Sequence, residues 1–131
     1  MQTAESEEQP LSSYRELLVW QKGMDLLIET YSLTSKLPAD ERFGLVTQMR
    51  KAAVSIPSNV AEGYGRRRRG EYLSHLGIAN GSLFELETQL IACGRLNFVT
   101  REEAADMWQL CKDGGKILNK LMASLETEET R

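Results

Sequence analysis

Histidine and cysteine, which supply many catalytic bases and metal ligands, are scarce in this chain of 131 residues. The single histidine, His75, has no serine–aspartate or cysteine partners that helical geometry would bring to it. Cys93 and Cys111 form no CxxC pair, and the Glu-x-x-His motif of di-metal bundles does not occur. P-loop, dinucleotide-binding and zinc motifs are also missing. We therefore expect a protein that is not an enzyme and that carries no metal or cofactor.

Long apolar runs are lacking as well, since no run approaches the roughly 18 residues that a membrane-spanning helix needs. Residues 1–10 are polar and lack the basic start and apolar stretch of a secretory signal. We expect a cytoplasmic protein with no membrane partner. The length of 131 residues and the apolar content of 41% suffice for one self-supporting core.

Apolar residues recur at alternating spacings of three and four in four separate stretches, which is typical of helices packed nearly parallel to one another. Breakers separate the stretches at Leu37–Pro38, Gly63–Gly70 and Gly94–Thr100, and Thr100 with Glu103 predicts a capping box. Short connections make neighbouring helices antiparallel, so the predicted fold is all-α, an antiparallel up-down-up-down four-helix bundle. The predicted core-facing series are Leu17, Trp20, Met24, Leu27, Tyr31; Val46, Met49, Ala53, Ile56, Val60; Tyr72, Leu76, Ala79, Leu83, Leu86, Leu90, Cys93; and Ala104, Met107, Cys111, Gly114, Leu118, Leu121, Leu125.

Charge is distributed unevenly along the chain. The net charge of −3 owes much to the two ends, which hold six glutamates against one arginine. We place the bundle at residues 13–125, between disordered acidic tails at residues 1–12 and 126–131. Because the bundle itself is close to neutral, any electrostatic function must rest on a local cluster.

Further apolar residues lie off the four series, more than one core can bury. They predict a second buried surface, most economically a subunit interface, although broad helical stripes with scattered exposed residues are the alternative. Cys93 and Cys111 are expected to be buried and roughly 13 Å out of register, too far apart for a disulfide. The off-series residues are Leu18, Val19, Ile28, Leu45, Ile78, Phe84, Ile91, Trp108, Leu110, Ile117 and Met122.

A polar motif interrupts the second apolar stretch. Ser55, Asn59 and Glu62 share one helical face, and Pro57 inside the helix predicts a kink near residues 53–57. We interpret these polar groups as structural, meeting a backbone carbonyl that the proline leaves unpaired. The alternative is that they line a ligand pocket.

Pairing of the second and third helices about a turn near Arg67 predicts which side chains meet across them. Asn59 falls near His75, so a hydrogen bond between these two is expected. Arg50 falls opposite the turn that holds Glu85 and Glu87, so an ion pair there would set the register of the helices.

Four consecutive arginines, Arg66 to Arg69, follow this motif in a glycine-flanked loop. Guanidinium groups make paired hydrogen bonds to phosphate oxygens, and Tyr64 offers an adjacent stacking face. With help from Lys51, this loop is the predicted nucleic-acid-binding site. The alternative is a solvated basic turn paired with the acidic tails or with neighbouring carboxylates.

The segment Gln48-Met-Arg-Lys-Ala-Ala-Val-Ser-Ile-Pro-Ser-Asn-Val-Ala-Glu-Gly63 resembles a bacterial four-helix-bundle family named after proteins encoded in intervening sequences of 23S ribosomal RNA genes. Matching segments on both sides, including Leu17-Leu-Val-Trp-Gln-Lys22, extend the resemblance over residues 14 to 124. It marks as family-pattern positions Gln48, Arg50, Ser55, Pro57, Asn59, Glu62 and Gly63. It implies a ring-like homopentamer. It also implies kinship with accessory proteins that associate with the reverse transcriptase and RNA of diversity-generating retroelements.

Residues and resemblance together predict a non-enzymatic, oligomeric helical bundle that binds RNA weakly through its arginine loop. Its expected partners are copies of itself, as a pentamer, and either RNA or a reverse transcriptase complex, with no small-molecule substrate. The alternative is a structural or adaptor scaffold that recruits a protein partner and makes no contact with nucleic acid.

Overall fold

A computed structural model describes residues 13–129. The described part forms four α-helices: α2 (Leu18–Thr34), α3 (Thr47–Arg66), α4 (Arg69–Arg95) and α5 (Arg101–Glu129). A short turn η1 (Tyr14–Glu16) precedes α2, and the turns η2 (Ala39–Glu41) and η3 (Arg42–Val46) connect α2 to α3. The tail expected at residues 1–12 lies outside the described residues, whereas α5 continues four residues past the predicted boundary at 125.

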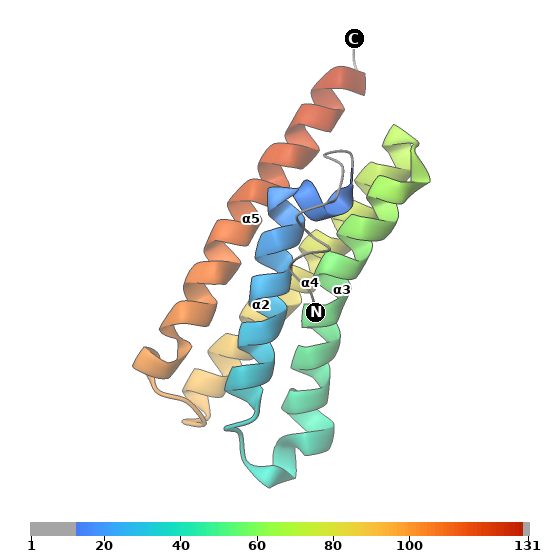
Figure 1. Cartoon of the computed structure of the whole chain (residues 1–131). Coiled ribbons are helices and arrows are strands. Elements are labelled where there is room, and N and C mark those ends of the chain that lie inside the picture. The colour runs from blue at the N-terminus through green and yellow to red at the C-terminus, as the bar shows by residue number, and fades with distance from the viewer. Residues whose placement is uncertain (1–12, 130–131) are drawn as a thin grey trace, which may run out of the picture.

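Consecutive helices run in alternating directions (Figure 1). Around the bundle α2 packs on α3 and α5, and α4 likewise packs on α3 and α5. The side formed by α2 and α3 is therefore opposite the side formed by α4 and α5. This arrangement confirms the predicted four-helix bundle. No helix in the described part of the chain is both long and apolar enough to cross a membrane.

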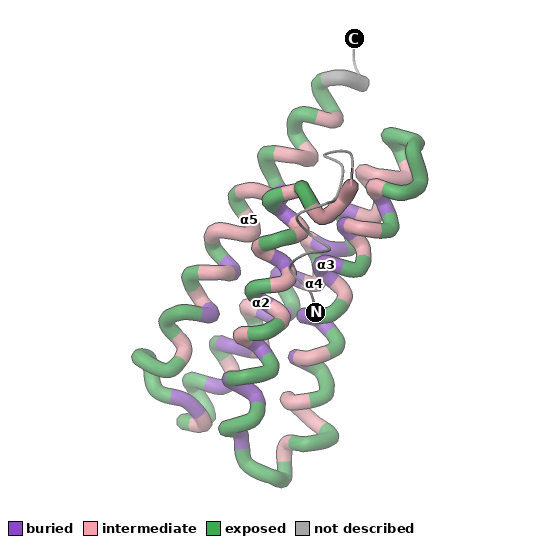
Figure 2. Tube along the Cα trace, in the orientation of Figure 1, coloured by how far each residue is buried: buried purple, intermediate pink, exposed green. Residues whose placement is uncertain are grey.

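Buried residues line the inside of the bundle along its length (Figure 2). The predicted core series of α3 and α4 are confirmed almost entirely, with Met49 and Val60 on α3 and Leu76 and Leu86 on α4 fully buried. On α5, the buried residues Met107, Cys111 and Leu118 follow the predicted series, and its other apolar members are partly buried against the same core. Three helices thus present the faces that their apolar period predicted.

The core-facing side of α2 is offset by one residue from the predicted series, which was wrong for this helix. Residues of that series are only half-buried, and Tyr31 is exposed. Thr30 can be fully buried because its hydroxyl donates to the Leu26 carbonyl at 2.7 Å. A series built from apolar residues alone does not include it. The residues on the buried side are Val19, Gly23, Leu26, Thr30, Leu33 and Thr34.

The off-series residues do not all behave alike. Val19 belongs to the core rather than to a second surface, because of the offset of α2. Five of the others are half-buried: Leu45, Trp108, Leu110, Ile117 and Met122. The remaining five are exposed: Leu18, Ile28, Ile78, Phe84 and Ile91. A single chain therefore leaves several large apolar side chains uncovered.

The connection between α4 and α5 is closed by hydrogen bonds at both of its ends. The Phe98 N–H donates to the Cys93 carbonyl at 2.9 Å and the Asn97 N–H to the Gly94 carbonyl at 3.0 Å, with Asn97 in the left-handed conformation. At the start of α5, the Thr100 N–H donates to the Glu103 carboxylate at 2.8 Å, and the Glu103 N–H donates to the Thr100 hydroxyl at 3.1 Å. The predicted capping box is confirmed.

Both cysteines are free and buried on different helices, as predicted. The Cys93 thiol donates to the Met49 sulfur at 3.6 Å. Burial raises the pKa of Cys111 to about 12, and the nearby charge of Glu87 adds to the shift. These thiols are core residues that resist ionisation.

Candidate nucleic-acid interface

The four arginines lie at one end of the bundle, where α3 passes into α4. We call Arg66, Arg67, Arg68 and Arg69 the arginine corner; all four are exposed. Only two of them lie outside the helices, because Arg66 ends α3 and Arg69 begins α4. Arg67 adopts the left-handed conformation at φ 68° and ψ 2°, and Arg68 is extended at φ −111° and ψ 131°.

The connection is therefore much shorter than the loop predicted from Gly63 to Gly70. The first and last of these glycines lie within helices, and one left-handed residue followed by one extended residue reverses the chain. Glycine is a helix breaker only on average, and the packing of α3 on α4 outweighs its low propensity. The corner is consequently a junction of two residues between two packed helices.

Carboxylates flank the arginine corner. Arg66 donates to the Glu62 carboxylate at 2.8 Å within α3, and the Arg68 guanidinium lies 4.0 Å from the Glu71 carboxylate in α4. The hydrogen bond from Arg66 lowers the pKa of Glu62, with a further contribution from the charge of His75. Both pairs are exposed to solvent, where ion pairs are weak and compete poorly with other anions.

The other predicted binding residues are not gathered equally. Tyr64 lies beside the corner, where its ring packs edge-on against Tyr72 with centroids 6.0 Å apart. Burial raises the pKa of Tyr72. Lys51 is exposed on α3, fifteen residues before Arg66 and so about 22 Å away along the helix axis. The structure does not bring Lys51 to the corner.

The polar motif of α3 ties this helix to α4. The Asn59 carbonyl oxygen lies 2.9 Å from His75 Nδ1, which confirms the predicted hydrogen bond. Because the Asn59 amide already donates to the Ser55 carbonyl and hydroxyl at 2.9 and 3.0 Å, its oxygen must accept from a protonated Nδ1. The Ser82 hydroxyl on α4 donates to the Ser55 hydroxyl at 2.8 Å, so two polar bridges join the helices.

Arg50 does not face α4, and the predicted pairing with Glu85 and Glu87 was wrong. Its Nε donates to the Thr34 hydroxyl at 2.8 Å, and its guanidinium lies over the Tyr31 ring, 4.4 Å from the centroid. The prediction considered only the pairing of α3 with α4. Arg50 instead lies on the side of α3 that packs on the end of α2.

The remaining motif residues lie at close helix contacts or at the surface. A Cβ on Gly63 would come within 2.7 Å of the His75 Cβ, so only glycine allows this approach of α3 to α4. α3 continues through Pro57, which packs against Gly23 of α2. Gln48 is exposed in the first turn of α3. Most of the motif therefore holds helices together.

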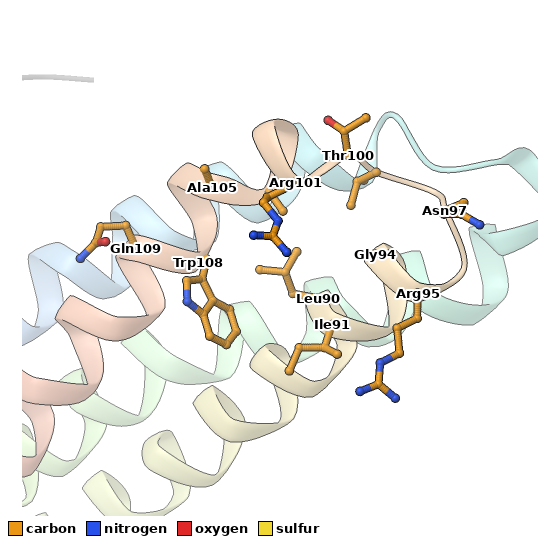
Figure 3. A pocket seen from close by; sticks show the side chains of 12 residues that line it. Leu90, Ile91, Gly94, Arg95, Asn97, Thr100, Arg101, Ala105, Trp108 and Gln109 are labelled. Carbon is orange, nitrogen blue, oxygen red and sulfur yellow. The ribbon is translucent and has the colours of Figure 1, made fainter.

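A groove between α4 and α5 was not predicted from the sequence. It has a volume of about 750 Å³. The groove (Figure 3) lies at the end of the bundle opposite the arginine corner (Figure 1). Ile91 and Trp108 contribute to its lining, and both belong to the off-series apolar residues. Within the described residues, no group of three or more histidine, cysteine or acidic side chains could hold a metal ion.

These features define a four-helix-bundle protein with a basic corner at one end. A model of the 23S rRNA-intervening sequence protein family matches residues 15–120, and the chain belongs to this family. A solved structure of a protein of unknown function, from the S23 ribosomal protein family of Bacteroides thetaiotaomicron, matches with a TM-score of 0.75 and 21% identity. The match covers 81% of this chain and 96% of that chain, and it shows a shared fold. No curated protein matches the chain.

Proposed function

We propose that this chain is a self-associating, non-catalytic bundle protein that binds RNA weakly, and with little sequence preference, through the arginine corner. The observation that supports this role is the exposure of four consecutive arginines where α3 turns into α4, two on the junction itself and one at the end of each flanking helix. Because the flanking helices fix the backbone of so short a junction, little backbone freedom remains to be lost when its side chains contact phosphates. The expected dissociation constant is that of non-specific contacts, about 10⁻⁴ to 10⁻⁶ M at physiological salt.

Self-association supports this function by multiplying a weak contact. The exposed apolar side chains of Ile28, Phe84 and Ile91 favour a partner surface, and the family resemblance points to five copies. A ring of five would present about 20 corner arginines to one polyanion, and linked weak sites bind far more tightly than single ones. Light scattering should report five times 14.8 kDa, about 74 kDa. A mass of 14.8 kDa at micromolar concentration would contradict self-association.

The test of RNA binding compares opposite changes at the same corner. Replacing the four arginines by serine should abolish binding to single-stranded and hairpin RNA, measured by fluorescence anisotropy. Glu62→Gln should instead strengthen binding severalfold, because it releases Arg66 from its ion pair and removes a charge that repels phosphate. Lys51→Ser is the matched control and should leave affinity nearly unchanged, since Lys51 lies far from the corner.

Salt dependence provides an independent check, because displaced counterions drive phosphate contacts and raised salt should weaken binding steeply. Two results would contradict the proposal: no RNA or DNA binding at about 50 mM salt, or equal binding by the serine variant. Either would favour the adaptor role, in which the corner contacts an acidic protein.

A further inference from the structure

Phe43 is the most exposed large apolar side chain in the described part of the chain, with 85% of its surface accessible. It belongs to η3, a π-helical turn at the end of the bundle opposite the arginine corner. Burying a phenylalanine side chain is favourable by about 1.5–3 kcal/mol, so leaving one exposed is a cost that a partner can remove. Exposure of this degree leaves the whole ring accessible to a partner.

The turn that carries Phe43 is held in place by side-chain contacts. The Glu41 carboxylate accepts a hydrogen bond from the Leu45 N–H at 3.1 Å and closes the turn. Gly44 has a non-helical conformation, and a Cβ there would lie 2.8 Å from the Glu41 carboxylate. The Arg42 guanidinium lies over the Phe43 ring, 5.3 Å from its centroid. Phe43 is therefore presented outward by an ordered turn.

The α4–α5 groove has the chemistry to receive an aromatic ring. The side chains of Ile91 and Trp108 are directed into the space between the two helices, and Arg101 turns toward the same space (Figure 3). Ile91 is 45% exposed and Trp108 is half-buried, so a ring placed between them would cover apolar surface on both helices. Aromatic rings packed in this way contribute strongly to protein interfaces.

Charge is complementary between the turn and the groove. Asp40 and Glu41 precede Phe43 by three and two residues, and their two negative charges exceed the single positive charge of Arg42, whose guanidinium lies over the ring. The charged residues that line the groove are Arg95 and Arg101. A carboxylate next to the inserted ring would thus meet a guanidinium at the edge of the groove, and such pairs fix orientation more than affinity.

The positions of the turn and the groove exclude insertion within one chain. Both lie at the same end of the bundle, but η3 joins α2 to α3 and the groove lies between α4 and α5, on the opposite side. A second copy displaced sideways, with its axis parallel, would present its groove to this turn. Contacts of different surfaces in this manner join subunits head to tail and close into rings when the rotation allows.

We propose that Phe43 of one copy inserts into the α4–α5 groove of a second copy, against Ile91 and Trp108, with Asp40 set against Arg101. This interface rests on the self-association proposed above and adds the surfaces that make it. Its failure is distinguishable from that of the proposed function: an oligomer unaffected by these residues would contradict the interface alone, and RNA binding is measured separately.

The first experiment measures mass by light scattering across a dilution series. Phe43→Ser should shift assembly to concentrations at least about tenfold higher, as should Ile91→Ser in the groove. Asp40→Arg should weaken assembly, and adding Arg101→Asp should restore it. Val54→Ser, which changes an exposed apolar residue of α3 outside both the turn and the groove, is the matched control and should leave the mass unchanged. Circular dichroism confirms that each variant remains helical.

The second experiment detects proximity directly. A chain carrying both Phe43→Cys and Ile91→Cys should form a ladder of disulfide-linked copies on mild oxidation, and chains with one change should not. Cys93 and Cys111 do not compete, since both are buried. A monomeric wild type, an unchanged mass for Phe43→Ser or the lack of a ladder would each overturn the proposal. A monomeric wild type would leave the groove to a different ligand or protein.

Discussion

At the scale of single residues, Gly63 marks the closest approach of α3 to α4. We predict that Gly63→Ala lowers the free energy of unfolding by about 1–3 kcal/mol, because the new methyl group would press on the His75 Cβ and the Tyr72 ring. The obstacle is the base of a side chain, so the helices themselves must move apart. Urea denaturation of the variant and the wild type measures the difference.

Gly65, two residues further along the same helix, is the matched control. A Cβ there would meet nothing within 4 Å, so Gly65→Ala should stabilise the protein by up to about 1 kcal/mol through helix propensity. Equal effects of the two changes would show that contact between the helices does not restrict position 63.

Because of Cys111, the free energy of unfolding should decrease at alkaline pH. Its pKa is about 12 in the folded protein against an ordinary value of 9.0, so its contribution is fully present below pH 9 and is lost as pH rises toward 12. Over that window, the free energy of unfolding should fall by up to about 1.4 kcal/mol per pH unit more in wild type than in Cys111→Ala. Denaturation series at several pH values provide the comparison, and parallel curves would contradict the prediction.

At the scale of elements, Arg50 fastens α3 to the end of α2. We predict that Arg50→Leu and Thr34→Val each destabilise the bundle and that their effects are not additive, with a coupling energy of about 0.5–3 kcal/mol. The reason is the hydrogen bond from Arg50 Nε to the Thr34 hydroxyl. A double-mutant cycle in urea measures the coupling. Additive effects would mean that this bond contributes nothing beyond packing.

The junction between α3 and α4 offers a stabilising change. Arg67 has a left-handed backbone, which costs a residue with a Cβ about 1–2 kcal/mol, so Arg67→Gly should raise stability by several tenths of a kcal/mol after the greater chain entropy of glycine is offset. Arg67→Ala removes the same charge but keeps the Cβ, so it is the control. A rise in the denaturation midpoint for both variants would point to charge rather than backbone strain.

Much of this architecture could be predicted, since the apolar period of α3, α4 and α5 records which face packs inward. Counting residues about the turn also placed Asn59 against His75. Two other polar residues, one buried and one bonded across helices, were predicted wrongly. Thr30 can be buried because its hydroxyl bonds to its own helix, and Arg50 bonds to Thr34 of α2 and not to α4. The α4–α5 groove depends on the distance and angle between two helices, and the spacing of residues along the sequence does not determine either.

At the scale of the whole molecule, assembly and RNA binding should be coupled. The proposed contact of Phe43 with the groove lies at one end of the bundle and the arginine corner at the other, so parallel copies would gather their corners on one face. We predict that Phe43→Ser weakens apparent RNA affinity by at least about 10²-fold, although no arginine changes. Anisotropy with long RNA measures this loss, and a trinucleotide, too short to span two corners, should show none.

The even number of helices has a practical consequence for the architecture of fusions. Because α2 begins and α5 ends at the same end of the bundle as the arginine corner, a domain joined directly to either helix end would lie near that corner (Figure 1). A bulky tag would therefore crowd the arginine corner while leaving the flanks of the bundle clear. A label at either helix end would thus obstruct the arginine corner and not the α4–α5 groove, which lies at the opposite end.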